Sequence, residues 1–435
     1  LKQTIKRYIP MATHHHGHHH EDMLSVEEAR DKILSQFGVL NAQNFLITEA
    51  LGLVTSDQVR SEINIPPLDN SAMDGYAVMS RDVSTATYEH PVMLEILETI
   101  PAGSLPTKPL KTGAASRIMT GAPVPEHCDA VIPFEDTTEK DFSKSGRLTE
   151  IGIRTSVSPG TNVRVKGKDI KEADSVLEEG HVITAATIGV LASMGMSHVR
   201  AIRKPVVSIL STGNELLSPG EKPAEGKIFD SNSSSIMASV IQLGAIPRYI
   251  GIARDEMGSV REKLREAMES DLVISSAGVS KGDYDMVKDV MSEHGDLQFW
   301  SVRMRPAKPL AFGTLNRGSK TSVPLIGLPG NPVSSLVAFE QFCRPAILKM
   351  MGKTNLHRPT IQAVLKDSIV NYDSRRVYAR VIVEQTEDGY TAKTTGHQDS
   401  NILTSMVHAN GLAICPEEEE SKDPGDIVTV IMLDD

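Results

Sequence analysis

The sequence predicts a multidomain α/β protein with a central α/β domain, whose mostly parallel sheet is covered by helices, plus a β-rich inserted domain and a small C-terminal β-barrel. The chain has 435 residues, 40% of them apolar, which is enough for about two to four domains. Between residues 204 and 352, apolar runs are repeatedly followed by loops of Gly, Ser, Thr or Asn. Short alternating segments, typical of antiparallel strands, lie on either side of that region.

Composition shifts and turn residues divide the chain into five parts. The first contains the histidine-rich stretch HHHGHHH, which is typical of an affinity tag or a low-complexity tail. Ordered sequence starts near Leu24, where a Ser followed by Glu residues indicates a helix that opens the first domain. The predicted parts are a disordered tail or tag (1–23), a split first domain (24–80 and 158–203), an inserted β-rich domain (81–157), an α/β domain (204–352) and a C-terminal barrel (353–435).

Charge and cysteine content exclude several classes of protein. The net charge of -11 argues against a general nucleic-acid binder, which needs a basic face, although a local basic pocket is compatible with it. No apolar run reaches the roughly 20 residues that span a bilayer, so we expect no membrane association. Cys128, Cys343 and Cys415 are too far apart for a zinc site or a disulfide framework. A reducing cytoplasm is therefore the expected location.

The segments PVVSILSTGNELL, DLVISSAGVSKGDYDMVKDVM and VPLIGLPGNPVSSLVAFEQF carry the strand and loop signals of the α/β domain. Right-handed crossovers place such loops along one edge of a parallel sheet, at the carboxyl ends of the strands. A fourth unit brings Asp230, Ser231 and Asn232 to the start of a helix, where backbone N–H groups bind anions. That edge is the predicted site.

Acids and bases gather in the same region. Glu215, Asp283 and Asp285 are suited to hold Mg²⁺, whereas Arg303, Arg305 and Lys308 are suited to phosphates. Each loop taken alone is more often a structural cap than a binding site, but several converging loops favour phosphate-centred chemistry. The chain contains neither a P-loop nor a dinucleotide-binding glycine motif.

Seven motifs together resemble the molybdopterin molybdotransferases, the MoeA and gephyrin E-domain family. They are DNSAMDGYAV, RIMTGAPVP, STGNEL, SSAGVSKGDYD, MRPAKPLAFG, GLPGNPVS and TTGHQDSN. The resemblance runs from about residue 24 to the end of the chain. It implies an elongated homodimer that inserts molybdate into adenylylated molybdopterin with the help of Mg²⁺ and releases AMP. It also implies a contact with the molybdopterin adenylyltransferase that supplies this substrate.

The resemblance also assigns roles to individual residues. It implies Glu215 and Asp285 as metal ligands, and it implies that Asp74 and Thr120 enter the cleft of the other subunit. From the residues alone, Asp74 would be a simple turn cap before the strand GYAV. The implied catalytic set is Asp74, Glu215, Asp255, Asp285, Arg305 and Lys308. The implied substrate-binding set is Thr120, Asp169, Thr212, Gly213, Ser280, Pro329, Gly330, Asn331, Pro332, Arg380 and Ser400.

Three positions depart from the family pattern, and two other functions stay open. Ser301 stands where many relatives have Lys, and Ala277 and Ala307 stand where they have Gly. We expect Arg303 or Lys281 to replace the missing charge. The alternatives are a non-catalytic gephyrin-like scaffold and a molybdopterin adenylyltransferase. The sequence does not distinguish molybdate from tungstate, because the two oxyanions have closely similar shapes.

Overall fold

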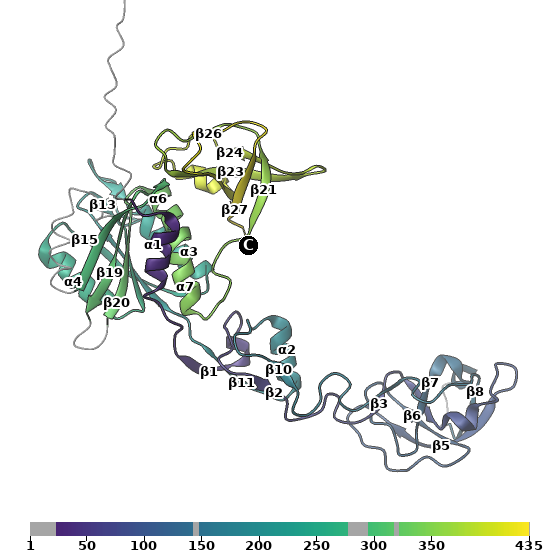
Figure 1. Cartoon of the computed structure of the whole chain (residues 1–435). Coiled ribbons are helices and arrows are strands. Elements are labelled where there is room, and N and C mark those ends of the chain that lie inside the picture. Colours follow the sequence, from purple (N-terminus) through teal and green to yellow (C-terminus); the bar gives the residue numbers. More distant parts are fainter. Residues whose placement is uncertain (1–22, 142–147, 277–294, 317–321, 435) are drawn as a thin grey trace, which may run out of the picture. The chain divides into compact units, whose positions relative to one another are not determined.

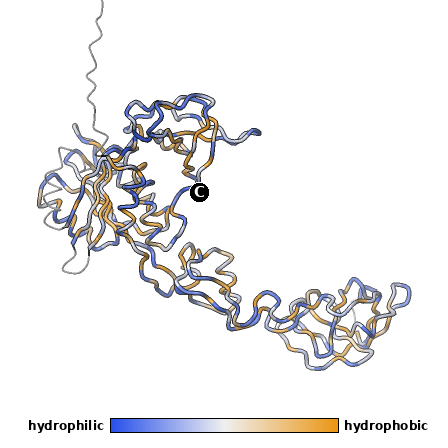
Figure 2. Tube along the Cα trace, in the orientation of Figure 1, coloured by the Kyte–Doolittle hydropathy of each residue, from blue (hydrophilic) through white to orange (hydrophobic). Residues whose placement is uncertain are grey.

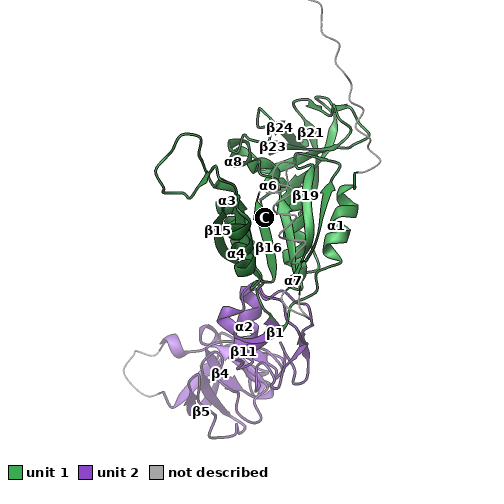
Figure 3. Cartoon of the chain, turned by 90° about the vertical axis from the view of Figure 1, so that its left-hand side faces the viewer, with its two compact units in different colours: residues 1–41, 202–435 green, residues 42–201 purple. Residues whose placement is uncertain are grey.

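The computed structural model describes residues 23–141, 148–276, 295–316 and 322–434 (Figure 1). The chain forms two compact units, Leu1–Asn41 with Ile202–Asp435 and Ala42–Ala201, which are coloured separately in Figure 3. Ser280 and Asp285, both predicted site residues, lie outside the described residues, as do Ala277, Lys281 and Asp283.

The first unit contains a six-stranded sheet, and its first four strands are parallel. The last two pairings across the sheet are antiparallel. The prediction of a mostly parallel sheet is therefore confirmed. In spatial order the strands are β15 (Ile246–Ala253), β12 (Val206–Thr212), β16 (Leu272–Ser276), β20 (Ser322–Leu328), β19 (Pro309–Asn316) and β17 (Gly295–Ser301). The central strands β12 and β16 are buried along nearly their whole length because both faces are covered, and Figure 2 shows the apolar colour concentrated in this sheet.

Helices cover both faces of this sheet. On β12, Ile209 points into one core and its neighbour Leu210 into the other. On β16, Ile274 and its neighbour Val273 divide in the same way, because successive side chains of a strand point to opposite faces. The first core contains α1 (Val26–Leu34), α3 (Ser231–Gln242), α6 (Pro332–Ala338), the π-helix η6 (Phe339–Cys343) and α7 (Arg344–Met350), and the second contains α4 (Met257–Ala267). A short parallel pair, β13 (Leu216–Leu217) and β14 (Ile228–Phe229), follows β12.

Helix α1 begins with the predicted capping box. Ser25 Oγ accepts the N–H of Glu28 at 3.1 Å, and the Glu28 carboxylate accepts the N–H of Ser25 at 2.8 Å. Its buried residues Val26, Ala29 and Ile33 belong to the large core of the α/β sheet. This differs from the prediction, which puts residues 24–41 in the first domain. Periodicity reveals that a helix has an apolar face but not which sheet that face covers.

The C-terminal part of this unit is a closed five-stranded barrel, as predicted. Its strands follow the order β23 (Arg376–Thr386), β24 (Gly389–Thr394), β21 (Thr360–Leu365), β27 (Ile427–Met432) and β25 (Gly411–Cys415), and β25 pairs with β23 again. A two-residue strand of the α/β domain, β18 (Met304–Arg305), pairs in parallel with β23. The barrel also carries β22 (Ile369–Val370), β26 (Ser421–Lys422) and α8 (Thr404–His408).

The second unit, Ala42–Ala201, contains a five-stranded sheet and several short elements. The sheet order is β7 (Ala130–Pro133), β4 (Gly75–Val78), β6 (Ala114–Ile118), β5 (Val92–Ile100) and β8 (Glu150–Ile153). Strand β4 belongs to this sheet because it pairs with β6 and β7, whereas the prediction begins the inserted domain only at residue 81. The other elements are β1 (Ala42–Leu46), β2 (Val59–Arg60), β3 (Asn70–Ser71), β9 (Val163–Arg164), β10 (Ser175–Leu177), α2 (Ala185–Ser193), β11 (His198–Ile202) and the 3₁₀ turns η2 (Ile47–Glu49), η3 (Ser80–Val83), η4 (Phe134–Asp136) and η5 (Glu139–Asp141).

None of the helices in the described part of the chain has the length and apolar character needed to cross a membrane.

Gly75 gives the first testable prediction. A Cβ at this position would lie 2.0 Å from the carbonyl oxygen of Ile132 on β7, so Gly75→Ala forces the two strands apart. We expect a loss of about 1–3 kcal/mol in the free energy of unfolding. Gly189 in α2 is the matched control, because a Cβ there meets nothing within 4 Å. Gly189→Ala is expected to stabilise by about 0.5–1 kcal/mol. Denaturant unfolding measures both, and equal stability of the two variants would contradict the β4–β7 contact.

Candidate functional site

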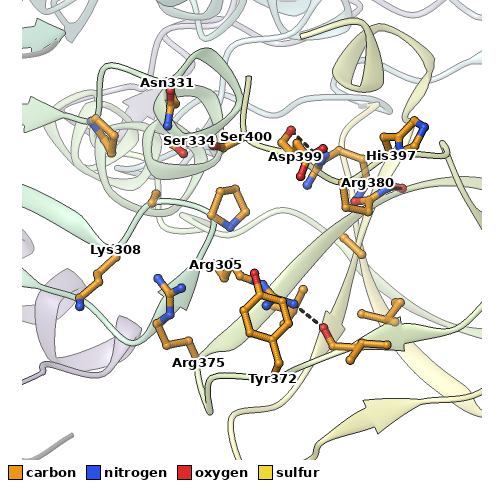
Figure 4. A pocket seen from close by; sticks show the side chains of 18 of the residues that line it. Arg305, Lys308, Asn331, Ser334, Tyr372, Arg375, Arg380, His397, Asp399 and Ser400 are labelled. Atoms are coloured by element: carbon orange, nitrogen blue, oxygen red, sulfur yellow. Dashed lines mark hydrogen bonds between the residues drawn. The ribbon is translucent and has the colours of Figure 1, made fainter. Parts of the chain in front are cut away.

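A cavity of about 780 Å³ lies between the α/β domain and the barrel (Figure 4). One wall comes from residues 305–309 and from the turn that follows β20, and the other wall comes from residues 368–380 and 394–400 of the barrel. Seven predicted site residues line it, namely Arg305, Lys308, Pro329, Gly330, Asn331, Arg380 and Ser400. Residues of the α/β domain and of the barrel therefore meet in one cavity.

Two of the cavity's cations donate no hydrogen bond to a carboxylate of the described residues, although the charge of Asp399 acts on Arg380 and opposes the effect of burial on its pKa. Arg380 on β23 is 1% exposed. Its Nε donates to Ser405 Oγ at 3.1 Å and its Nη2 to the carbonyl of Asp399 at 3.3 Å, and both acceptors are neutral. Burial lowers the pKa of Arg380 to about 10, so it stays charged at neutral pH. For Lys308, the described residues provide no hydrogen bond or ion pair to Nζ. Both charges are available to an anion.

Arg305 and Arg375 are more strongly engaged. Arg375 Nε donates to Asp373 Oδ2 at 2.9 Å, and Arg305 Nη1 lies 3.8 Å from Asp373 Oδ1. Arg305 also donates to the carbonyl of Val370 and lies over the ring of Tyr372, with its Cζ 4.0 Å from the ring centroid. One carboxylate thus serves two guanidinium groups, which leaves an excess of positive charge.

The turn after β20 is fixed by hydrogen bonds. Asn232 at the start of α3 donates to the carbonyl of Gly330 at 2.8 Å and to Ser276 Oγ at 2.7 Å. The N–H of Val333 donates to the carbonyl of Ser400 at 3.1 Å, which joins the turn to the barrel. Pro332 follows Asn331 as the first residue of α6 and is not among the described residues that line the cavity.

The acidic residues follow the carboxyl ends of β12 and β15, which lie farther along the same sheet edge. Thr212 ends β12, and Gly213 has a φ of +145° that favours glycine. A Cβ on Gly213 would lie 2.4 Å from a carboxylate oxygen of Glu215, so this position brings the acid close to the backbone. Asp255 accepts the N–H of Asn214 at 3.0 Å. These residues share the sheet edge with the turn after β20 but do not line the cavity.

The start of α3, predicted to bind an anion, is already capped by an acid. Asp230 is buried and its carboxylate accepts the N–H of Ser233 at 3.0 Å. Because this carboxylate occupies the N-terminus, the helix start serves as a cap.

The metal site is only partly within the described residues. Glu215 has the carboxylate chemistry that Mg²⁺ prefers, and Mg²⁺ usually takes one or two carboxylates and keeps several waters. Asp285, its predicted partner, lies outside the described range. Among the described residues, no three His, Cys, Asp or Glu side chains lie close enough together to hold a metal ion.

In the second unit, the side chain of Asp74 is held by Thr120, a residue 46 positions later in the sequence. Its Oδ1 accepts both the N–H and the hydroxyl of Thr120, at 2.7 and 2.8 Å. These hydrogen bonds lower the pKa of Asp74. The hydroxyl of Ser71, which accepts the N–H of Met73 at 3.2 Å, caps the local turn instead. Asp74 is thus an exposed, fixed carboxylate, and Asp169 is also exposed on this unit.

The structure does not place Arg303 where it could replace the lysine that many relatives have at position 301. Neither Arg303 nor Ser301 is among the described residues that line the cavity. The pKa of Glu28 is lowered chiefly by hydrogen bonds from Ser25, and the charge of Arg303 contributes as well, which places Arg303 near α1. No feature of the described structure explains Ser301.

Sequence reasoning missed several residues of the cavity. Tyr372, Ser334, His397, Gln398 and Asp399 all line it. The motif TTGHQDSN contains three of these, but only the barrel topology shows which way they point. Gln398 accepts the N–H of Arg380 at 2.8 Å and so fixes the strand that carries this arginine.

Ala307, in the cavity wall, has a φ of +79°, which strains any residue with a Cβ by about 1–2 kcal/mol. Because glycine loses about 0.5–1 kcal/mol more chain entropy on folding, we expect Ala307→Gly to stabilise the protein by about 0.5–1 kcal/mol. Ala379 on β23 is the control, since Ala379→Gly removes a buried methyl group from a strand and should destabilise. Denaturant unfolding measures both changes, and a destabilised Ala307→Gly would show that the methyl group packs favourably.

Comparison with known proteins covers nearly the whole chain. Residues 24–195 match the MoeA N-terminal region (domain I and II), residues 208–349 a probable molybdopterin binding domain, and residues 362–433 the MoeA C-terminal region (domain IV). Molybdopterin molybdenumtransferase 2 of Mycobacterium tuberculosis is 36% identical over 404 residues, which cover 91% of this chain and 96% of the relative. Molybdopterin molybdenumtransferase of Haemophilus influenzae is 32% identical over 412 residues, covering 94% and 98%. The crystal structure of a molybdopterin biosynthesis MoeA protein from Pyrococcus horikoshii has a TM-score of 0.78 at 30% identity and covers 95% of this chain and 100% of that one.

Proposed function

The chain belongs to the MoeA family of molybdopterin molybdenumtransferases, and we propose that it inserts molybdate into adenylylated molybdopterin and releases AMP and molybdenum cofactor. The observation that carries this proposal is the cavity between the α/β domain and the barrel. In a protein with a net charge of -11, this cavity is lined by Arg305, Lys308, Arg375 and Arg380. Such a concentration of cations favours a ligand with several negative charges.

Lys308 and Arg380 are the residues we assign to the oxyanion or the phosphates of the substrate. Neither donates a hydrogen bond to a carboxylate among the described residues, and Asp399 acts on Arg380 through its charge without such a bond, so an anion can bind both cations without displacing an internal hydrogen bond to a carboxylate. Asn331 and Ser400 add neutral hydrogen-bonding groups to the same wall. Arg305 serves mainly to hold this wall, because Val370, Asp373 and Tyr372 already occupy its guanidinium group.

The acidic side of the site is formed by Glu215 and Asp255, together with Asp285. Mg²⁺ held by Glu215 and Asp285 would neutralise charge on the phosphate that is cleaved. Thr212 and Gly213 lead into the loop of Glu215, and its carboxylate lies close over Gly213, whose φ of +145° favours glycine. Pro329 and Pro332, in the turn after β20, belong to the proposed substrate-binding set, which also includes Ser280.

Asp74, Thr120 and Asp169 are proposed to act in the cleft of a second subunit of a homodimer. The support is that Asp74 is exposed, ionised and fixed by Thr120 although its own turn is capped by Ser71. A contact with molybdopterin adenylyltransferase and a cytoplasmic location are parts of the same proposal. All three cysteines are free, in agreement with a reducing compartment.

The activity itself is tested by incubating the purified chain with adenylylated molybdopterin, Mg²⁺ and molybdate, and measuring AMP. We expect AMP release that depends on molybdate. Lys308→Met should weaken molybdate binding by about 1.5–3 kcal/mol, the range for hydrogen bonds to charged groups, which is roughly 10–150-fold. Lys366→Met, which removes an exposed lysine of the barrel outside the cavity, should have no effect.

Two outcomes would contradict the proposal. Absence of AMP release with any divalent metal favours a scaffold, and formation of adenylylated molybdopterin from molybdopterin and MgATP favours an adenylyltransferase. Equal molybdate affinity of the Lys308→Met and Lys366→Met variants would remove Lys308 from the site. Competition between molybdate and tungstate decides which oxyanion is preferred.

Complementation between two impaired variants, assayed at a molybdate concentration too low to saturate Lys308→Met, tests the action of Asp74 across a dimer. Mixed dimers of Asp74→Ala and Lys308→Met subunits contain one intact cleft if Asp74 serves the partner's cavity, so we expect part of the activity to return. Mixed dimers of Asp74→Ala and Thr120→Val should stay inactive, because both changes affect the same unit. If mass spectrometry confirms mixed dimers and the first pair shows no rescue, Asp74 does not act across the interface.

A further inference from the structure

Tyr372 is an exposed aromatic residue in the wall of the cation-lined cavity (Figure 4). It is 79% exposed, whereas Tyr390, another surface tyrosine of the barrel, is 38% exposed and does not line the cavity. A single exposed aromatic residue is ordinary on a protein surface. Tyr372 differs because its ring is paired with a residue of the opposite wall.

That partner is Arg305, whose guanidinium carbon lies 4.0 Å from the centre of the Tyr372 ring. The guanidinium group is itself fixed by the carbonyl of Val370 and by Asp373. Arg375 holds the other oxygen of Asp373 at 2.9 Å. The Tyr372 ring thus rests against a guanidinium group whose own position is fixed, which reduces the side-chain freedom that is lost when a ligand binds.

The high exposure of the ring leaves aromatic surface open although Arg305 occupies one side. Aromatic surface of this kind binds planar heterocycles by stacking, with little dependence on their hydrogen-bonding pattern. Lys308 and Arg380 in the same cavity supply positive charge for phosphates or an oxyanion. The cavity thus combines a stacking surface with anion-binding groups.

We propose that Tyr372 stacks against a fused heterocycle of the substrate, the pterin or the adenine, while the cations of the cavity hold its anionic groups. This inference rests on the proposed function and adds a substrate-contacting residue to it. Stacking on Tyr372 then selects ligands that carry both a planar ring and a negative charge.

Calorimetric titration of three separate probes tests the proposal: AMP, pterin-6-carboxylate and molybdate. Stacking on an aromatic side chain accounts for roughly tenfold in affinity. We therefore expect Tyr372→Ala to weaken binding of AMP or of the pterin about tenfold and to leave molybdate affinity unchanged. Tyr372→Phe keeps the ring and should bind like the wild type, and Tyr390→Ala is the matched control. With adenylylated molybdopterin, Tyr372→Ala should raise KM with little change in kcat.

The probe that loses affinity identifies the ring that stacks on Tyr372. Unchanged affinity for both ring compounds, or wild-type protein that binds neither of them, overturns the proposal. An equal loss of molybdate affinity in Tyr372→Ala also overturns it, because the residue would then shape the cavity rather than stack. Failure of the proposed function is a different result, since it appears as absence of AMP release in the wild type.

Discussion

The pairing of β18 with β23 is the interaction on which the cavity depends. Met304 and Arg305 lie opposite Arg376 and Val377 in parallel register, and the N–H of Arg376 donates to the carbonyl of Arg303 at 3.0 Å. These backbone hydrogen bonds add to the apolar contact between the two domains, in which Tyr378 and Leu412 of the barrel join the core of the α/β sheet, whereas the barrel interior has a core of its own. Like charges repel, so several cations stay in one cavity only if such bonds fix the backbone that carries them. The cavity is therefore a consequence of a two-residue strand that leaves one domain to pair with the other.

The fold positions Arg380 by burial rather than by an ion pair. A buried guanidinium group would normally be matched by a carboxylate, but Ser405 and the carbonyl of Asp399 supply neutral acceptors instead. Burial consequently lowers the pKa of Arg380 without removing its charge at neutral pH. The folded protein therefore bears the cost of desolvating Arg380, and the charge of Arg380 remains able to bind a ligand. An internal carboxylate would stabilise the fold but would compete with any anion.

The sequence predicts much of this architecture and the residue types of the site, but it does not predict their partners. Apolar runs indicate the parallel strands and alternation of polar and apolar residues indicates the barrel, because each pattern reflects how a strand is buried. The same patterns fail for α1 and β4, since an apolar face does not show which core it joins. Motif resemblance identifies Arg305 as a site residue, whereas the contacts with Asp373 and Tyr372 depend on the loop between β22 and β23. Tyr372 is missed because its loop carries no periodic pattern.

The departure at position 307 shows how sequence and structure complement each other. Comparison with the family pattern marks Ala307 as unusual, and the backbone supplies the reason, since its φ of +79° favours glycine. At position 301 the structure does not explain the departure from the family pattern. Ser301 is not among the described residues that line the cavity, so no replacement charge is needed there. A departure from a family pattern is thus informative only when the local backbone or the contacts of that residue are known.

The acidic residues lie apart from the basic residues of the cavity, which explains how one sheet edge can carry both an anion-binding cavity and free carboxylates. Asp399 is the one carboxylate among the described residues that line the cavity, and its carbonyl, not its carboxylate, receives the hydrogen bond from Arg380. Glu215 and Asp255 lie in the loops that follow β12 and β15, away from that lining. If these acids faced Lys308 directly, they would form internal ion pairs and neutralise the charge that an anion requires. Placing them on different strand ends preserves both an anion-binding cavity and free carboxylates, which chemistry on a charged phosphate requires together.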